Sequence, residues 1–201
     1  MKVSISRGNS KMGAVHSVSL PLSTCPPDVP CHPDHCKGGL VCYGKKAWFP
    51  SLHRALARNL KIWRSDPDDY FGQIGDHIAG HGVDLFRWHV YGDIPTAGYL
   101  RGMLDIAAAF PRVRFVCFSK NLVSLGFVVV IEDMENLQLI QSLWPPELVP
   151  PGCTWNNEPI PGLRHAWIAG DPRASGRPCS GQCDACAHCF RPGGDVVLQP
   201  H

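Results

Sequence analysis

Four cysteines stand close together near the C-terminal end of the chain, in the pattern Cys-x3-Cys-x2-Cys-x2-Cys. They are Cys179, Cys183, Cys186 and Cys189. Thiols at this density indicate a metal centre. Zinc sites made of four cysteines usually use two knuckles set well apart, whereas gaps of two and three residues are typical of ferredoxin loops. The run therefore predicts an iron–sulfur cluster, and a zinc ion is the alternative.

A second group of metal-type ligands lies near the N-terminal end. Its cysteines are Cys25, Cys31, Cys36 and Cys42. Their gaps are longer than those of the C-terminal run, and His32 and His35 stand among them, so zinc is also a candidate because it accepts Cys/His mixtures. Three arrangements are open: a second iron–sulfur cluster, a zinc site, or one zinc ion that joins Cys31 and Cys36 to two C-terminal thiols.

The compartment decides whether clustered cysteines bind metals or form disulfides. Residues 1–7 lack the apolar core of a signal peptide, and the longest apolar run, residues 127–131, is too short to cross a bilayer. We therefore expect a cytoplasmic protein without membrane association. In a reducing compartment such cysteines are metal ligands more often than disulfides, and a secreted disulfide framework is the alternative.

Charge is distributed unevenly along the chain, although the net charge is only +2. Residues 1–64 hold ten Lys and Arg against two Asp, and residues 65–201 hold nine against fifteen acidic residues. Within the basic part, Arg54, Arg58 and Lys61 share one face of a predicted helix. Such a face suits contact with nucleic-acid phosphates, and a plain solvated helix face is the alternative.

Apolar residues between the two cysteine groups alternate between strand-like and helix-like spacing. Strand-like runs cover residues 2–6, 17–22, 84–90, 113–118, 126–131 and 164–169, and helix-like runs begin near 50, 66 and 95, with another over 136–144. The alternation predicts an α/β fold: a partial, half-barrel-like, largely parallel sheet with covering helices and two Cys-rich metal-binding loops. We expect an α/β domain over 1–170, including the loop 25–42, and a Cys-rich tail over 171–201 packed on the same domain.

One helix start is well marked, because Asp66 can cap the helix and Pro67 follows at its first position. Later in that helix, His77 and His81 stand four residues apart, as paired metal ligands do. No Glu-x-x-His frame accompanies them and Gly80 lies between them, which counts against a ligand role.

Ligand sites in parallel sheets lie at the carboxyl ends of the strands. We expect this edge to collect the first Cys-rich loop and several polar residues. They are Asn9, Lys11, Asp93, Ser119, Lys120, Gly170 and Asp171. The glycine-bounded loop 8–13 could cradle an anion through its backbone N–H groups, and a plain turn is the alternative.

Arg87 and His89 fall on one face of the predicted strand 84–90, together with Leu85 and Tyr91. If that face lines the interior, the two polar side chains need a partner such as Asp93 or a bound anion. Exposure to solvent, or a structural ion pair, is the alternative.

The order of the predicted elements resembles a radical S-adenosylmethionine (SAM) barrel: a strand, a Cys-rich loop, a helix, and a strand that ends in Gly92-Asp93. The resemblance implies that Asp93 holds the amino group of SAM or of a substrate. The cysteine spacing of that family, Cys-x3-Cys-x2-Cys, is absent from the N-terminal loop and occurs instead at Cys179, Cys183 and Cys186, which resembles the auxiliary centres of some of these enzymes.

A closer resemblance rests on several motifs together. They are the loop 8–13, Ser19-Leu20-Pro21, the Cys-rich loop that ends in Cys42-Tyr43, the run 86–93 (Phe-Arg-Trp-His-Val-Tyr-Gly-Asp), Cys117-Phe118-Ser119-Lys120, and the Cys-rich tail. These resemble the gene product 88 family of phages and mobile elements over nearly the whole chain. The resemblance implies a mobile-element origin and a shared site. This chain departs from the pattern by extra residues, including Cys36, before Cys42.

We therefore predict an iron–sulfur protein of a phage or mobile element that resembles a minimal radical-SAM-type enzyme, with an unknown small-molecule or macromolecular substrate. Its expected cofactors are one or two clusters of the 4Fe-4S type, and SAM is a further candidate. The metal ligands are the eight cysteines named above. The candidate catalytic residues are Lys11, Arg87, His89, Asp93 and Lys120, and the candidate cofactor-binding residues are Asn9, Ser10, Gly92, Asp93 and Ser119. The alternative is a non-catalytic zinc module that binds nucleic acid or a host protein. A third hypothesis is a thiol redox protein with an exposed cysteine of low pKa.

Overall fold

The computed structural model describes residues 1–27, 29, 49–122, 134–149, 151 and 157–199. Three of the four N-terminal cysteines, Cys31, Cys36 and Cys42, lie outside these residues, and so does the predicted strand 126–131. No helix in the described part is long and apolar enough to cross a membrane.

Eight strands form one sheet in the order β1-β2-β3-β4-β5-β6-β8-β7. They are β1 (Ile5–Ser6), β2 (His16–Val18), β3 (Leu85–Trp88), β4 (Arg114–Ser119), β5 (Leu137–Leu143), β6 (Arg164–Ile168), β7 (Arg177–Pro178) and β8 (Val196–Leu198). β1 is antiparallel to β2, and all other neighbours are parallel. The predicted α/β class with a largely parallel sheet is confirmed, and the tail contributes β7 and β8 to the same sheet.

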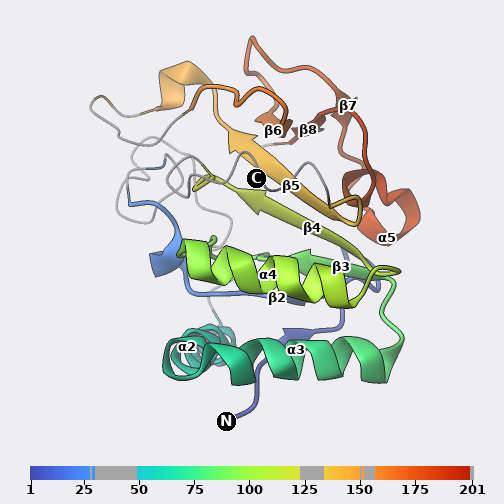
Figure 1. Cartoon of the computed structure of the whole chain (residues 1–201). Coiled ribbons are helices and arrows are strands. Elements are labelled where there is room, and N and C mark those ends of the chain that lie inside the picture. The colour runs from blue at the N-terminus through green and yellow to red at the C-terminus, as the bar shows by residue number, and fades with distance from the viewer. Residues whose placement is uncertain (28, 30–48, 123–133, 150, 152–156, 200–201) are drawn as a thin grey trace.

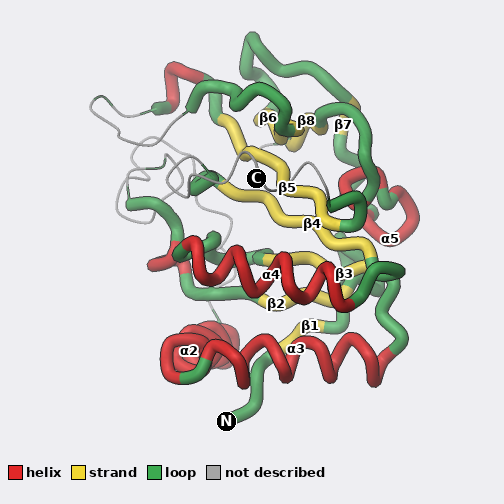
Figure 2. The backbone as a smooth tube through the Cα atoms, viewed as in Figure 1, coloured by secondary structure: helices red, strands yellow, loops and turns green. Residues whose placement is uncertain are grey.

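Three long helices gather on one side of the sheet, as Figure 1 shows for α2 (Pro50–Ser65), α3 (Pro67–His81) and α4 (Ala97–Ala109). The predicted start of α3 is confirmed, because the Asp66 side chain accepts a hydrogen bond from the backbone N–H of Asp69 at 2.9 Å. Shorter helical turns connect the elements: η1 (Leu22–Thr24), η3 (Pro146–Leu148), α5 (Cys183–Cys186) and η4 (His188–Phe190). Figure 2 shows how loops outweigh regular structure in the C-terminal part.

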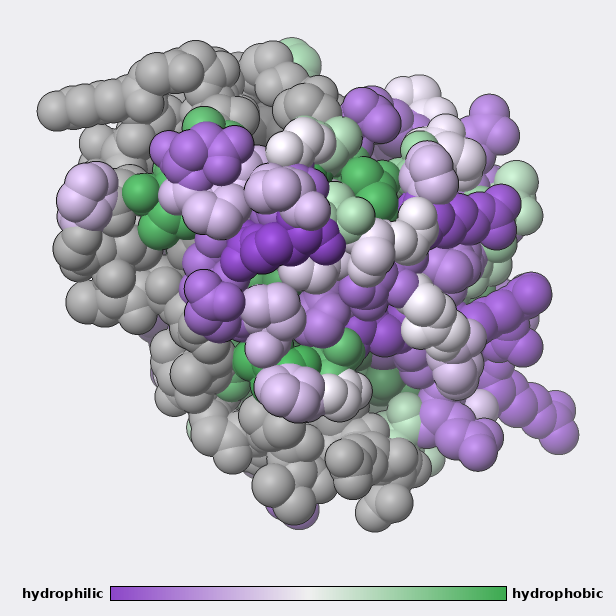
Figure 3. All heavy atoms as spheres, turned by 90° about the horizontal axis from the view of Figure 1, so that it is seen from above, coloured by the Kyte–Doolittle hydropathy of each residue, from purple (hydrophilic) through white to green (hydrophobic). Residues whose placement is uncertain are grey.

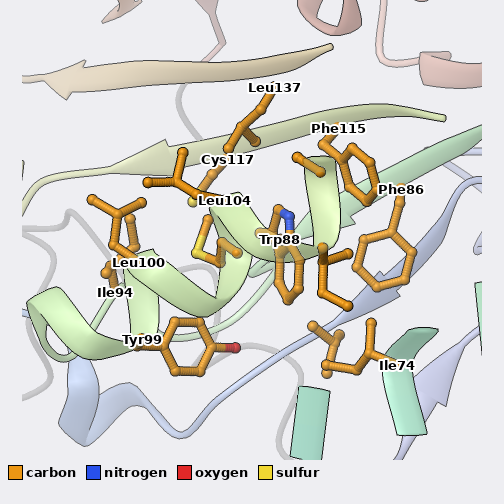
Figure 4. Packing of buried hydrophobic residues seen from close by; sticks show 14 of the residues in the cluster. Ile74, Phe86, Trp88, Ile94, Tyr99, Leu100, Leu104, Phe115, Cys117 and Leu137 are labelled. Atoms are coloured by element: carbon orange, nitrogen blue, oxygen red, sulfur yellow. The ribbon is translucent and has the colours of Figure 1, made fainter. Parts of the chain in front are cut away.

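The main core lies between the sheet and α3 and α4. Trp88, Phe86 and Phe115 project from β3 and β4 towards the helices, where they meet Tyr99 of α4 and Ile74 of α3 (Figure 4). All five side chains are fully buried. Burial of each large side chain stabilises the fold by roughly 1.5–3 kcal/mol, so this layer holds β3 and β4 against the helices.

The tail covers the other face of the sheet and builds a smaller second core. Its buried members are Met12, Val15, Val116, Ile140, Ala166, Phe190 and Val196. Cys179, Cys183 and Cys189 pack against this second core. In Figure 1, α5 lies at the side from which β4 and β5 start. The described surface seen from above shows hydrophobic residues in small separate patches among hydrophilic ones (Figure 3).

The predicted helix over 136–144 is wrong, because this segment is β5 at the centre of the sheet. Its residues Leu137 and Leu139 face the main core, while Ile140 faces the second core. A strand that is covered on both faces has apolar residues at all spacings, so the helical spacing of Leu137, Ile140 and Leu143 was accidental.

Candidate functional site

The four C-terminal cysteines line one pocket on the second face of the sheet. Cys183 and Cys186 are the first and last residues of α5, Cys179 follows β7, and Cys189 lies in η4. Ala187 has a left-handed φ of +47°, which ends α5 and leads directly into η4. All four cysteines are free thiols. The four cysteines that stand close together in the sequence therefore also surround one pocket in the structure.

The thiols differ in their surroundings. Cys179, Cys183 and Cys189 pack against the second core, and burial raises the pKa of Cys183 and raises that of Cys189 to about 11. The pKa of Cys186 is lowered instead, chiefly by a hydrogen bond from the backbone of His188. A centre that binds thiolates must displace the protons of these half-buried thiols, and metal binding does release such protons.

Two arginines bring positive charge to the half-buried thiols of Cys183 and Cys189. The charge of Arg87, on β3, opposes the rise in the pKa of Cys183 and Cys189 that burial causes, and the charge of Arg164, on β6, opposes the rise for Cys189. The carbonyl oxygen of Gly194 anchors Arg164 by accepting its Nη2–H at 2.6 Å. The site therefore combines sulfur ligands with cations that favour their charged form.

No three His, Cys, Asp or Glu side chains converge closely enough to bind a single metal ion in the part of the chain that the structure describes. The structure therefore does not show that the two predicted Cys-rich loops bind metal. The four C-terminal thiols share a pocket without meeting at one point. Of the N-terminal group only Cys25 is described, and it is half-buried directly after η1.

The glycine-bounded loop 8–13 is a turn whose backbone donors are partly used within the turn. The Asn9 side chain accepts hydrogen bonds from the backbone N–H groups of Lys11 and Met12, both at 2.9 Å. Ser10 and Lys11 are exposed. Because β1 and β2 are antiparallel, this loop lies at the amino ends of the parallel strands. The expectation that Asn9 and Lys11 stand at the carboxyl edge is therefore wrong.

The same loop is joined to the cysteine-rich tail. Asp184 of α5 accepts a hydrogen bond from the backbone N–H of Ala14 at 3.1 Å, and the backbone N–H of Asp184 donates to the carbonyl oxygen of Met12 at 3.2 Å. Gly13 lies against this carboxylate, with φ +66° and no room for a Cβ atom. The loop thus positions the helix that carries two of the thiols.

Asp93, Ser119 and Lys120 do meet at the carboxyl ends of β3 and β4, where Asp93 is fully buried. The Asp93 carboxylate accepts hydrogen bonds from the Ser119 hydroxyl at 2.5 Å and from the backbone N–H groups of Ile94 and Lys120 at 2.8 and 2.9 Å. Burial raises the pKa of Asp93, and the charge of Lys120 opposes that shift. Three protein donors thus surround the carboxylate and tie this edge of the sheet together.

Gly92, predicted as a cofactor-binding residue, is needed for the close approach of two backbone segments. Its φ is +77°, and a Cβ atom there would lie 2.6 Å from Thr24 Oγ1 and 2.7 Å from the carbonyl oxygen of Leu20. The Thr24 hydroxyl also accepts a hydrogen bond from the backbone N–H of Asp93 at 3.0 Å. The segment that leads into the first Cys-rich loop is therefore fixed to the end of β3.

Arg87 and His89 do not share a face, contrary to the expectation from strand alternation. β3 ends at Trp88, and His89 has a left-handed φ of +58°, which turns its side chain to the helix-covered face. There its Nε2 lies 3.1 Å from Tyr99 Oη and its Nδ1 lies 3.7 Å from Cys117 Sγ. Burial lowers the pKa of His89 to about 3. Arg87 lies on the opposite face, where its Nη1–H points to the sulfur of Met12 at 3.5 Å, and Met12 belongs to the second core against which three of the thiols pack.

Sequence reasoning paired His77 with His81 on α3 but missed His16, at the start of β2, which completes a cluster of three histidines. His16 Nδ1 lies 2.8 Å from His77 Nε2, and the rings of His77 and His81 stack with their centroids 4.1 Å apart. Arg7 donates to His81 Nε2 at 2.8 Å. The four-residue spacing signalled the pair on α3, but only the position of β2 beside α3 brings His16 to it.

Comparison with known proteins identifies a family for this chain. The model of the family described as gene product 88 matches residues 4–144. The match includes the loop 8–13, the run 86–93 and the end of β4, and it stops before the cysteine-rich tail, so the resemblance covers less of the chain than expected. No curated protein and no solved structure matches.

Proposed function

The chain belongs to the gene product 88 family, and we propose that it is an iron–sulfur protein whose C-terminal cysteines hold a cluster of the 4Fe-4S type. The ligands would be Cys179, Cys183, Cys186 and Cys189. The observation that carries this proposal is that four free thiols line one pocket over an apolar core. When bound, such a cluster supplies one-electron transfer.

The arrangement of the thiols favours a cluster over a single zinc ion. Zinc sites made of four cysteines usually use two knuckles set well apart, because one short loop strains to close a tetrahedron. In a cluster, the thiolates are distributed over several irons. The short gaps within the run point in the same direction.

The proposal does not extend to cleavage of SAM. The resemblance to radical-SAM enzymes rested on the order of elements and on Asp93, and the donors around the Asp93 carboxylate are the Ser119 hydroxyl and two backbone N–H groups. A second centre in the N-terminal loop stays a prediction. Its ligands would be Cys25, Cys31, Cys36 and Cys42.

Paired variants of the cysteines test the cluster assignment. The double variant Cys183→Ser and Cys189→Ser, purified without oxygen, should lose the iron and sulfide that the wild-type tail holds. The matched control is Cys117→Ala, which changes a buried cysteine on the helix-covered face and should leave the iron content unchanged. If the wild type and the double variant contain the same amount of iron, the cysteines of the tail are not ligands of the cluster.

A zinc module that binds nucleic acid is the second candidate, because Arg54, Arg58 and Lys61 are all exposed on α2. If this surface binds phosphates, the affinity for DNA or RNA should fall steeply with salt, and the slope should decrease by about one for each cation removed. A protein that contains zinc and shows this dependence would favour the module over the iron–sulfur protein.

A further inference from the structure

Three imidazoles meet a guanidinium where the end of α3 lies beside β2. His16 Nδ1 lies 2.8 Å from His77 Nε2, and the rings of His77 and His81 stack with their centroids 4.1 Å apart. The guanidinium is that of Arg7, whose Nη2 lies 2.8 Å from His81 Nε2. His16 and His77 are half-buried, whereas His81 and Arg7 are exposed. None of these four residues lines the thiol pocket.

The hydrogen bonds show where the protons of the cluster lie. A guanidinium can only donate, so His81 Nε2 accepts from Arg7. The proton of the His81 ring is therefore on Nδ1, which donates to the carbonyl oxygen of His77 at 2.9 Å. The contact between His16 Nδ1 and His77 Nε2 needs one proton between the two nitrogen atoms. In this arrangement His81 is neutral, and the other two rings carry at most one positive charge between them.

The charges that shift the pKa values of these rings come from basic groups. Burial is the main cause of the lowered pKa of His77, followed by the charges of His81, His16, Arg7 and Lys2. The pKa of His16 is lowered by burial and then by the charges of His81 and Arg7. Residues from four segments of the chain thus bring positive or protonatable groups to one place.

The acidic residues that are closest along the neighbouring elements do not balance these groups. Asp76 precedes His77 on α3, and Asp84 precedes β3, which is the neighbour of β2. Both are exposed, and neither forms an ion pair among the described residues. A metal ion is disfavoured too, because Arg7 occupies His81 Nε2 and its charge repels a cation. The cluster therefore suits an anion.

We propose that this cluster binds a phosphate group or a similar dianionic oxyanion, and that one proton is taken up with the anion. The proton comes from solvent and adds to His81 Nε2, and the Arg7 N–H that was directed at this nitrogen turns to an oxygen of the anion. The anion thus accepts charge-assisted hydrogen bonds from Arg7 and from the His81 imidazolium. His81 is the last residue of α3, where the helix dipole also favours a positive charge. The site does not involve the cysteines, so its failure would leave the proposed function untouched.

Calorimetric titration of the full chain with sodium sulfate at constant ionic strength tests the proposal. Sulfate stays a dianion near neutral pH, so every proton taken up must go to the protein. Titrations at about pH 6 in two buffers of different ionisation enthalpy should show about one proton taken up per sulfate bound. By linkage, the association constant should then rise by up to about tenfold for each pH unit lowered. Parallel titrations with inorganic phosphate and with a nucleoside monophosphate distinguish free phosphate from the phosphate group of a nucleotide as the preferred ligand.

Matched variants locate the binding at the cluster. Arg7→Met removes its guanidinium and should weaken sulfate binding about tenfold or more, as expected for the loss of a hydrogen bond between charged groups. Arg101→Met removes an exposed cation that pairs with Asp105 on α4, and it should bind sulfate like the wild type. His81→Gln keeps a side-chain donor that cannot take up a proton, so its remaining affinity should change little with pH.

Three results would overturn the inference. The first is equal affinity of Arg7→Met and Arg101→Met for sulfate, which would place the binding elsewhere. The second is sulfate binding by the wild type without proton uptake. The third is a wild-type protein that binds no sulfate, including one whose His77 and His81 ring signals in NMR spectra shift with zinc instead.

Discussion

The carboxylate of Asp184 accepts a hydrogen bond from the backbone N–H of Ala14 at 3.1 Å and so joins segments 170 residues apart in the sequence. Asp184 lies between the thiols of Cys183 and Cys186, outside the part of the chain that matches the gene product 88 family. Ala14 lies inside that part. The loop before β2 is therefore the base on which the cysteine-rich tail is positioned.

Removal of the hydrogen bond between Asp184 and Ala14 should lower the free energy of unfolding. Asp184→Ala removes the acceptor for the Ala14 N–H, and a hydrogen bond of this kind contributes about 0.5–1.5 kcal/mol to the free energy of unfolding. The control is Asp105→Ala, which removes an exposed ion pair with Arg101 and should cost at most about 0.5 kcal/mol. Urea denaturation of both variants measures the difference, and equal losses would contradict the role of Asp184.

Gly13→Ala adds a single methyl group but should lower the free energy of unfolding substantially. The position has φ +66°, and the added Cβ atom would overlap the Asp184 carboxylate, so we expect a loss of more than about 1 kcal/mol. Gly72→Ala is a matched control of opposite sign, because that glycine lies within α3 with nothing within 4 Å of the new atom. It should stabilise the protein by about 0.4–1 kcal/mol. A thermal melt that shows both variants shifting in one direction would refute this assignment.

The histidine cluster should make the fold sensitive to acid. Burial, followed by the charges of His81, His16, Arg7 and Lys2, lowers the pKa of His77 to about 4, and burial with the charges of His81 and Arg7 also lowers that of His16. At these two side chains the unfolded chain binds more protons than the folded chain below about pH 6.5, so their contribution to the free energy of unfolding should fall as the pH decreases from there towards pH 4.

The variant His77→Gln isolates this effect, because every other titrating group is common to it and the wild type. Its free energy of unfolding, measured in urea between about pH 7 and pH 5, should decrease less steeply than that of the wild type. Parallel curves would show that His77 is not the source of the acid sensitivity.

Replacement of Asp93 should lower the free energy of unfolding and leave the metal content of the protein unchanged. Asp93→Ala leaves the Ser119 hydroxyl and two backbone N–H groups without their acceptor, and unsatisfied buried donors cost about 1–3 kcal/mol each. Ser119→Ala removes one donor and should cost less. Chemical denaturation ranks the two variants, and a fully stable Asp93→Ala protein that had lost its bound ligand would restore the ligand-binding role predicted for Asp93.

The sequence predicted elements whose signals are local. The start of α3 followed from Asp66 and Pro67, and β3 followed from a short apolar run bounded by turn residues. β5 could not be recognised, because both of its faces are buried and the alternation that marks a strand disappears. The pairing of the tail with the loop 8–13 was invisible as well, since it depends on the antiparallel β1 and on contacts between the two ends of the chain.

The sequence was sufficient to predict the candidate ligands of the site, but not the residues that surround them. The spacing of the tail cysteines marked them directly. The place of Arg87 on the face of the sheet that the tail covers was hidden, because strand alternation grouped Arg87 with His89 and only the left-handed φ of His89 separates the two. A single backbone angle thus decides which polar side chain lies on the face that carries the thiols.

The metal content of the protein tests the central claim most directly. The chain should be purified without oxygen from iron-supplemented cells and examined by elemental analysis and visible absorption. The account predicts a coloured protein with about four irons and four sulfides per chain, or about eight of each if the N-terminal cysteines also hold a cluster. A colourless protein that contains one zinc per chain, or no metal at all, would contradict it.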